Sequence, residues 1–173
     1  MVNHYPKPMI VVHWLTLLFV VAAYLSSGNP LKTGLQGQIH VITGMSVFIL
    51  FLIRILFLFH YRGQLPQNVI INRTQEILFK IVRLLLYVSL FALPLLGWLA
   101  LSSLTDHFRL LGFNLMLFSS VSQNEFFGTV HQFLGNLFIS LVGLHTGAAL
   151  IHHFYLKDNV LKSILFSRDK RKW

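Results

Sequence analysis

Long apolar stretches separated by short polar segments dominate the chain. The stretches cover about residues 10–27, 39–59, 84–104 and 128–156. As α-helices, all are long enough to cross a hydrocarbon core about 30 Å thick. The turn residues Gly28, Asn29 and Pro30 end the first stretch, and residues 63–72 join the second to the third. The pattern predicts an all-α fold, an integral membrane four-helix bundle that forms a single transmembrane domain over residues 1–173.

Segments beside the apolar stretches have a mixed character. Residues 72–83 alternate apolar and charged side chains, which predicts an amphipathic lead-in to the third span at the membrane surface. Residues 106–127 are polar at both ends and apolar between, so we expect a lid on the outer face and no fifth span. Pro94 lies inside the third stretch, where it predicts a kinked helix.

Composition agrees with a membrane location. Hydrophobic residues make up 55% of the chain and charged residues 11%, which is too apolar for an ordinary soluble domain. The first stretch has the length of a secretory signal, but it carries His13 and Trp14 and lacks an Ala-x-Ala-like cleavage site, so we expect it to remain as a span. The chain has no cysteine, which excludes thiolate metal sites and covalent haem attachment. Any haem must be held non-covalently.

The positive charges are distributed unevenly between the two sides of the predicted membrane. The formal net charge is +9, with 14 Lys and Arg residues. If the spans alternate in direction, Lys32 and Arg109 fall on one side and the remaining twelve of the 14 fall on the other. Because cytoplasmic loops carry the excess of Lys and Arg, we predict that both termini are cytoplasmic. The basic segment 168–172 is then a lipid-surface anchor, and no nucleic-acid partner is predicted.

Histidines inside the apolar stretches are the strongest chemical signal, because an ionisable group in a membrane needs a partner. His131 and His145 are fourteen residues apart, close to four helical turns, so they share a face and lie about 21 Å apart along the axis. His13 lies near the cytoplasmic start of the first span and matches the depth of His145. His40 lies near the outer start of the second span and matches His131. Two pairs at two depths predict axial ligation of two haem b groups, although a single such histidine could instead hydrogen-bond across helices.

Small residues and one arginine accompany these pairs. Glycines follow or flank the histidines at positions 44, 135, 143 and 147, where they would let a flat macrocycle approach, or simply let helices pack. Arg54 follows His40 by fourteen residues and is predicted to bind a propionate of the inner haem, or else to extend to the headgroups. His152, seven residues beyond His145, is a candidate for a quinone or propionate site, with an interfacial location as the alternative. The remaining histidines are expected at the surface or an interface: His4, His60, His107 and His153.

In combination, these residues resemble the bacterial cytochrome b561 family over nearly the whole chain. The matching pieces are Tyr5-Pro6-Lys7-Pro8, Val12-His13-Trp14-Leu15, Ile39-His40-Val41 with Arg54, Tyr87, Ala92-Leu93-Pro94, Gly97-Trp98, His131, Gly143-Leu144-His145, Ala148 to His153, and Lys157-Asp158. The resemblance implies a multi-pass protein of the bacterial inner membrane, with two haems that exchange electrons with quinone. For close relatives it implies oxidation of superoxide at the outer face, with ubiquinone as acceptor. Relatives often carry a histidine early in the third span, where this chain has Lys80 and Arg83, so its acceptor or potentials can differ.

Three functions are compatible with these features. The first is a membrane oxidoreductase that oxidises superoxide beside His40 and His131, with Lys32 or Arg109 attracting the anion, Arg109 being preferred. The second is a haem-bearing anchor subunit that links a dehydrogenase or hydrogenase to the quinone pool. The third is a non-haem bundle that moves a metal or protons. The third is disfavoured because the acidic residues all lie outside the apolar stretches: Glu76, Asp106, Glu125, Asp158 and Asp169.

Overall fold

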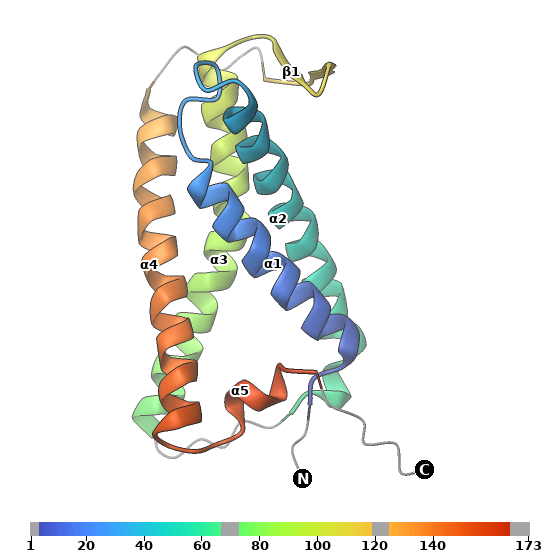
Figure 1. Ribbon diagram of the computed structural model, residues 1–173, viewed down its shortest axis with the longest axis vertical. Helices are drawn as coiled ribbons and strands as arrows, with labels where there is room; N and C mark the ends of the chain where they lie inside the picture. Colours follow the sequence, from blue (N-terminus) through green and yellow to red (C-terminus); the bar gives the residue numbers. More distant parts are fainter. Residues whose placement is uncertain (1–3, 67–72, 119–124, 167–173) are drawn as a thin grey trace.

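Four long helices make up most of the protein. A computed structural model describes residues 4–66, 73–118 and 125–166. The elements are α1 (Lys7–Leu25), α2 (Leu35–His60), a 3₁₀ turn (Arg62–Gln64), α3 (Arg73–Leu104), β1 (Phe108–Leu110), β2 (Phe113–Leu115), α4 (Phe126–Phe154) and α5 (Val160–Ser163), shown in Figure 1. The helices α1, α2, α3 and α4 are long and apolar enough to cross a membrane. The predicted four-helix membrane fold is therefore confirmed.

The largest difference between a helix and its apolar stretch is at the start of α3. From Arg73 onward the expected amphipathic lead-in is part of α3, which runs for 32 residues. The helix also continues through Pro94, because a membrane helix can tolerate the missing backbone donor. Backbone hydrogen bonds continue beyond the apolar residues, so the apolar pattern underestimates the length of α3.

The segment after α3 contains the one β structure in the part of the chain that the structure describes. β1 and β2 pair antiparallel, with Phe108 opposite Leu115 and Leu110 opposite Phe113. The two-residue turn between them has positive φ at both positions, 51° at Leu111 and 89° at Gly112. Such a turn matches the twist of a hairpin. The fold is thus mostly helical as predicted, with a short hairpin over residues 108–115 where a local turn sets the structure.

The helices pack mainly as two pairs. α1 packs on α2, α3 packs on α4, and α2 joins the pairs through α3, whereas direct contact of α4 with α1 and α2 is sparse. A small apolar core lies where the helices meet: Val20, Val47, Phe51, Leu90 and Phe138. Most other large apolar side chains face outward. In a lipid-facing bundle that is expected, since the surrounding solvent is itself apolar.

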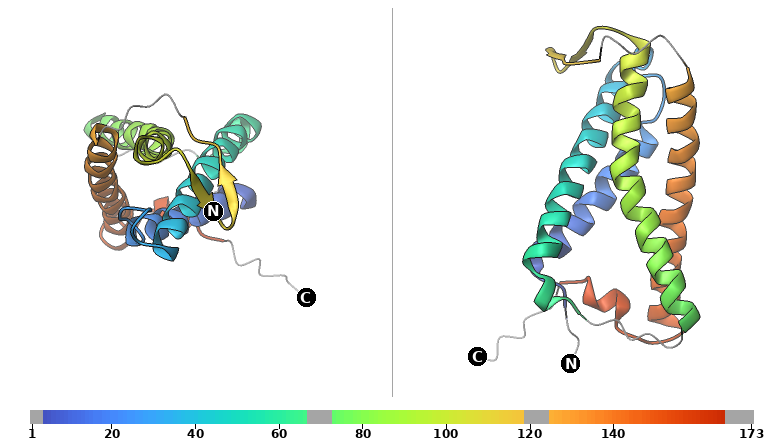
Figure 2. Two further views of the ribbon diagram at one scale, coloured as in Figure 1. Left: turned by 90° about the horizontal axis from the view of Figure 1, so that it is seen from above. Right: turned by 180° about the vertical axis from the view of Figure 1, so that it is seen from behind.

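The bundle has two distinct ends, visible in Figures 1 and 2. The hairpin end carries β1, β2 and the α1–α2 connection, and the terminal end carries α5 and both ends of the described chain. At the terminal end the backbone N–H of Tyr5 donates to the carbonyl of Ser163 over 2.9 Å. The indole N–H of Trp14 donates to the carbonyl of Ile164 over 3.0 Å. These bonds fasten the segment after α4 to the start of α1.

A close backbone contact fixes the start of α2 at the hairpin end. A Cβ atom added at Gly37 would lie 2.5 Å from Cα and 2.7 Å from the carbonyl oxygen of Pro30. Only glycine therefore lets the α1–α2 connection lie against the first turn of α2. Because His40 follows Gly37 by nearly one turn, this contact also sets the position of the histidine.

Candidate haem sites

Two histidines predicted as ligands of one haem lie side by side at the hairpin end. His40 comes from α2 and His131 from α4, although these helices otherwise make little contact. Their ring centroids are 6.0 Å apart, and the ring planes are nearly perpendicular at 86°. Both side chains are half-buried. The fold therefore brings together two imidazoles that are 91 positions apart in the chain.

Backbone carbonyls define the tautomer of both rings. Nδ1 of His40 lies 2.8 Å from the carbonyl oxygen of Ala23, and Nδ1 of His131 lies 3.1 Å from that of Leu93. A carbonyl only accepts, so each Nδ1 must carry the proton and donate it. Each neutral ring then has an unprotonated Nε2, which finds no hydrogen-bond partner among the described residues. Metal-binding histidines commonly have this arrangement, because the Nδ1 bond orients the ring and makes Nε2 more basic.

The carbonyl that holds His40 is available because of where α1 ends. Ala23 belongs to the last turn of α1, where carbonyls lack the intrahelical donor that the next turn would provide. The N–H of Ser27 donates to Tyr24 and leaves the Ala23 carbonyl to other donors. The negative end of the helix dipole also lies here, which favours the partly positive Nδ1–H of His40 that points at it.

A glycine on α3 allows His131 to approach its carbonyl. A Cβ atom at Gly97 would lie 3.0 Å from Cε1 and 3.4 Å from Nδ1 of His131. Leu93, which accepts the Nδ1 hydrogen bond, is one turn earlier on the same face of α3. Gly97 thus provides the space that lets the ring lie flat against this helix.

The residues at the hairpin end fit an axially ligated haem iron. An iron between the rings would place their centroids roughly 6 Å apart, since each metal–imidazole bond is about 2 Å and each nitrogen lies about 1 Å from its ring centre. The observed 6.0 Å agrees with that separation. A Cβ atom added at Gly44 or Gly135, one turn beyond each histidine, would meet no atom within 4 Å. Open space therefore lies beside both predicted ligands.

The second pair lies at the terminal end and includes an arginine. Arg54 on α2 donates from Nη1 to Nδ1 of His13 over 3.0 Å and from Nε to the Tyr87 hydroxyl over 2.9 Å. Its guanidinium carbon also lies 5.6 Å from the centre of the Tyr87 ring. His145 is near enough to interact electrostatically with both His13 and Arg54. The fold therefore gathers the predicted inner ligands and the predicted propionate partner at one end of the bundle.

His13 is not arranged like the hairpin-end histidines. Because Arg54 can only donate, Nδ1 of His13 must accept, and the neutral ring carries its proton on Nε2. Ligation through Nε2 would require the proton to move to Nδ1 and Arg54 to release that atom. Among the described residues Arg54 contacts no carboxylate. A propionate would supply the missing anion and draw the guanidinium away from His13, so the residues fit a haem whose binding rearranges this contact.

The hydroxyl of Tyr5 lies near Arg54, and its pKa reflects the burial and the positive charge at the terminal end. Burial raises the pKa of the Tyr5 hydroxyl above its usual value, and the nearby cations Arg54 and Arg83 partly oppose this effect. Two arginines thus act on one half-buried phenol just outside the membrane-spanning part of α1. Their combined charge favours an anion in this region.

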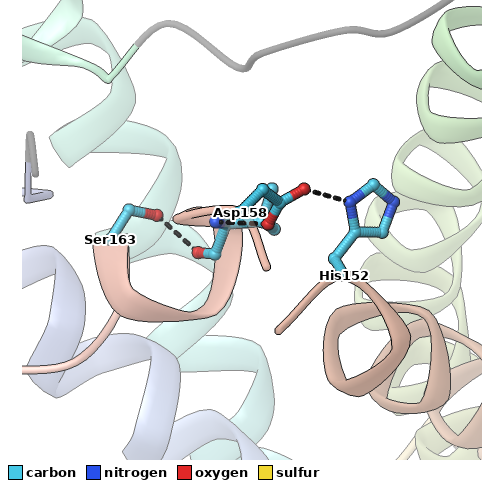
Figure 3. A network of polar contacts seen from close by, with 4 residues as sticks. His152, Asp158 and Ser163 are labelled. Carbon is cyan, nitrogen blue, oxygen red and sulfur yellow. Dashed lines mark hydrogen bonds and ion pairs between the residues drawn. The ribbon is translucent and has the colours of Figure 1, made fainter. Parts of the chain in front are cut away.

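His152 pairs with an acidic residue that the sequence did not single out. Its Nδ1 contacts Oδ2 of Asp158, and Oδ1 of Asp158 accepts the backbone N–H of Val160 over 3.0 Å (Figure 3). α4 ends at Phe154, and beyond it Lys157 has φ of 54°, a left-handed conformation next to Asp158 in the turn that brings this carboxylate to His152. The Nε2 atom of His152 has no hydrogen-bond partner within residues 4–66, 73–118 and 125–166.

The remaining predicted positions lie apart from these sites. Arg109 is exposed on β1, where Nε donates to the amide oxygen of Asn114 over 3.4 Å, and Lys32 is exposed at the same end. His60 and His107 are exposed, as expected. His4 contacts the carbonyl of Leu165. His153 was expected at the surface or an interface, but its Nδ1 atom is buried and has no hydrogen-bond partner among the described residues.

Sequence reasoning missed the groups that position the ligands. The carbonyls of Ala23 and Leu93 carry no sequence signal, since every residue has one. Gly97 and Asp158 stood within matching motifs, but nothing in the chain said that they contact His131 and His152.

Comparisons with known proteins agree with these observations. The model of a family described as prokaryotic cytochrome b561 matches residues 4–167. Cytochrome b561 homolog 1 of Escherichia coli (strain K12) is 29% identical over 169 residues, covering 92% of this chain and 95% of that protein. A protein of Yersinia pestis named probable superoxide oxidase CybB is 26% identical over 169 residues, covering 87% and 89%. With its four apolar helices and this match over most of its length, the chain belongs to the prokaryotic cytochrome b561 family of haem b electron-transport proteins of the bacterial inner membrane.

Proposed function

We propose that this protein carries two haem b groups and transfers electrons from superoxide at its hairpin end to ubiquinone in the bilayer. The observation that supports this most is the His40–His131 pair, with centroids 6.0 Å apart and both Nδ1 atoms donating to backbone carbonyls. The name of the Yersinia pestis relative, probable superoxide oxidase, supports the choice of donor. When bound, the haems supply the one-electron chemistry.

The chain's own residues hold and tune these groups. His40 and His131 ligate the haem at the hairpin end, and the carbonyls of Ala23 and Leu93 make both imidazoles more basic. His13 and His145 ligate the haem at the terminal end. There Arg54 binds a propionate and keeps its hydrogen bond to Tyr87.

The hairpin end faces the periplasm in this proposal. Of the 14 Lys and Arg residues, only Lys32 and Arg109 belong to connections at that end, and the positive-inside rule places such an end outside. These two exposed cations attract the superoxide anion. Each superoxide loses one electron and leaves as O₂, so two are consumed for every quinone that takes up two electrons and two protons to become quinol.

We place the quinone near His152 at the terminal end. Asp158 accepts a hydrogen bond from Nδ1 of His152, so when the ring carries a second proton its Nε2–H donates to a quinone carbonyl. That Nε2 proton is the one that would pass to the reduced quinone. This placement is independent of the donor at the other end.

The experiment is a haem count combined with a superoxide pulse. Purified protein should contain two haem b per chain, and His40→Ala and His131→Ala should each lose the same one, with His13→Ala and His145→Ala losing the other. A superoxide pulse should reduce haem in the wild type, and His40→Ala should slow that reduction strongly. One haem per chain, or variants of one pair that lose different haems, would contradict the ligand assignment. Failure of superoxide to reduce either haem would contradict the donor and favour an anchor subunit served by a partner dehydrogenase or hydrogenase.

A further inference from the structure

The hairpin formed by β1 and β2 is amphipathic across its two faces. Directly paired residues of an antiparallel ladder point to the same side. One side therefore carries the pairs Phe108–Leu115 and Leu110–Phe113, and the other carries Arg109 paired with Asn114. The hydrogen bond between Arg109 and Asn114 crosses the polar side. The hairpin thus has one apolar and one polar face.

Contacts at both ends hold the hairpin on the bundle. At its base Phe108 is only 7% exposed, and the N–H of Phe118 donates to the Ser102 hydroxyl over 3.2 Å. At its tip the N–H of Leu111 donates to the side-chain oxygen of Gln38 in the first turns of α2, also over 3.2 Å. The orientation of its two faces is therefore set by the fold.

The apolar face loses its cover toward the tip. Phe113 is 79% exposed, and Leu111 in the turn is 64% exposed. Leu111 holds a left-handed conformation that large side chains rarely adopt, in a two-residue turn with Gly112. Large apolar side chains that are held in place and left uncovered indicate a surface that contacts an apolar partner.

The position of the hairpin indicates that lipid is what these uncovered side chains contact. In Figures 1 and 2 the hairpin extends sideways from the end of the bundle instead of rising along its axis. Its tip is bonded to Gln38, level with the start of the apolar helix α2, where the hydrocarbon core gives way to headgroups. The same first turns of α2 also expose the apolar side chains of Leu35 and Ile39.

We propose that the tip of the hairpin, Leu111 to Phe113, inserts into the membrane interface as an anchor at the hairpin end. The side chains of Leu111 and Phe113 enter the headgroup region, and Arg109 on the opposite face remains in water or contacts lipid phosphates. The anchor does not depend on the haems, on the electron donor or on which side of the membrane this end faces.

Single-cysteine labelling tests the anchor. Because the chain has no native cysteine, the label attaches only at the introduced position. The polarity-sensitive fluorophore NBD is attached at Phe113→Cys or at its matched control Asn114→Cys, on the opposite face of the same strand. Each full-length protein, with its b-type spectrum verified, is reconstituted at low density in vesicles of phosphatidylethanolamine and phosphatidylglycerol. Lipids brominated near the headgroup end of the acyl chain should quench the label at 113 at least twofold more than the label at 114. Aqueous iodide should show the reverse order.

Two results would overturn the proposal. Equal iodide access at both positions would mean that the hairpin stands clear of the bilayer. A label at 113 that neither bromine nor iodide reaches would mean that protein covers the face, and energy transfer between differently labelled chains would identify a second copy. If Phe113→Cys fails to retain the b-type spectrum, Leu111→Cys carries the same expectation against the same control.

Discussion

Substituting Gly97 by alanine tests whether α3 positions the histidine at the hairpin end. The new Cβ atom would lie 3.0 Å from Cε1 of His131, whereas carbon atoms in comfortable contact are about 3.5–4.0 Å apart. The imidazole must therefore retreat from α3 by about 0.5–1 Å. Its Nδ1 is now 3.1 Å from the Leu93 carbonyl, so a retreat of that size exceeds the usual hydrogen-bond distance.

The expected cost can be set against a competing gain. Glycine to alanine inside a helix ordinarily stabilises it by about 1 kcal/mol. Here the crowding costs about 1–3 kcal/mol, and the lost partner of a half-buried N–H costs about as much again. Outer partners of metal-bound histidines are worth about 10–100-fold in metal affinity, so we expect weaker retention of the hairpin-end haem by that factor.

The assay is haem content after purification, together with redox titration of the b-type absorption bands. Gly97→Ala should lose haem at the hairpin end, or shift only the potential of that haem, and leave the other unchanged. Gly128→Ala on α4 is the matched control, because its added Cβ atom would meet nothing within 4 Å. If Gly97→Ala keeps both haems with unaltered potentials, the Leu93 carbonyl does not hold His131 in the working protein and our reasoning fails.

Four further predictions concern other parts of the molecule. Arg54→Gln should lower the potential of the terminal-end haem, because a nearby cation stabilises the reduced form, with about 60 mV for each tenfold loss of that preference; an unchanged redox titration would exclude the propionate role. Gly37→Ala should destabilise the protein by about 1–3 kcal/mol in thermal unfolding, since the new Cβ atom meets the backbone of Pro30; a melting curve like that of the wild type would show that the connection yields freely. Arg109→Gln should slow haem reduction by superoxide and flatten its salt dependence, since screening acts over about 8 Å at physiological ionic strength; stopped-flow traces that match the wild type at every salt concentration would remove the steering role. A reporter that works only in the cytoplasm should be active when fused to the carboxyl terminus, and one that works only in the periplasm should be inactive there; the opposite result would invert the proposed electron path.

Much of this protein can be read directly from its sequence, because a membrane constrains patterns strongly. Backbone groups in lipid must be bonded internally, so an apolar stretch of sufficient length has almost no alternative to a helix. Periodicity then placed His131 and His145 on one face, and alternating topology matched them in depth with His40 and His13. Arg54 was expected near the inner pair by the same fourteen-residue spacing, and its 3.0 Å contact with His13 agrees with that placement.

Periodicity failed where a local turn or a distant contact decides the structure. The sequence pattern did not indicate the hairpin in the outer segment, which the turn at Leu111 and Gly112 produces. No spacing rule indicates that two residues in left-handed conformations will follow one another, one of them a leucine.

Only the tertiary structure decided how each histidine is used. The donation of His40 to Ala23 and of His131 to Leu93 assigns Nε2 as the free nitrogen, and it depends on where helices end and how closely they approach. The donation of Arg54 to His13 sets the opposite tautomer at the other pair. A sequence states which side chains exist and, in a membrane, at what depth they lie. Hydrogen bonds to backbone carbonyls and clearances of a few tenths of an ångström arise only when the helices have packed, because they belong to pairs of residues that the chain keeps far apart.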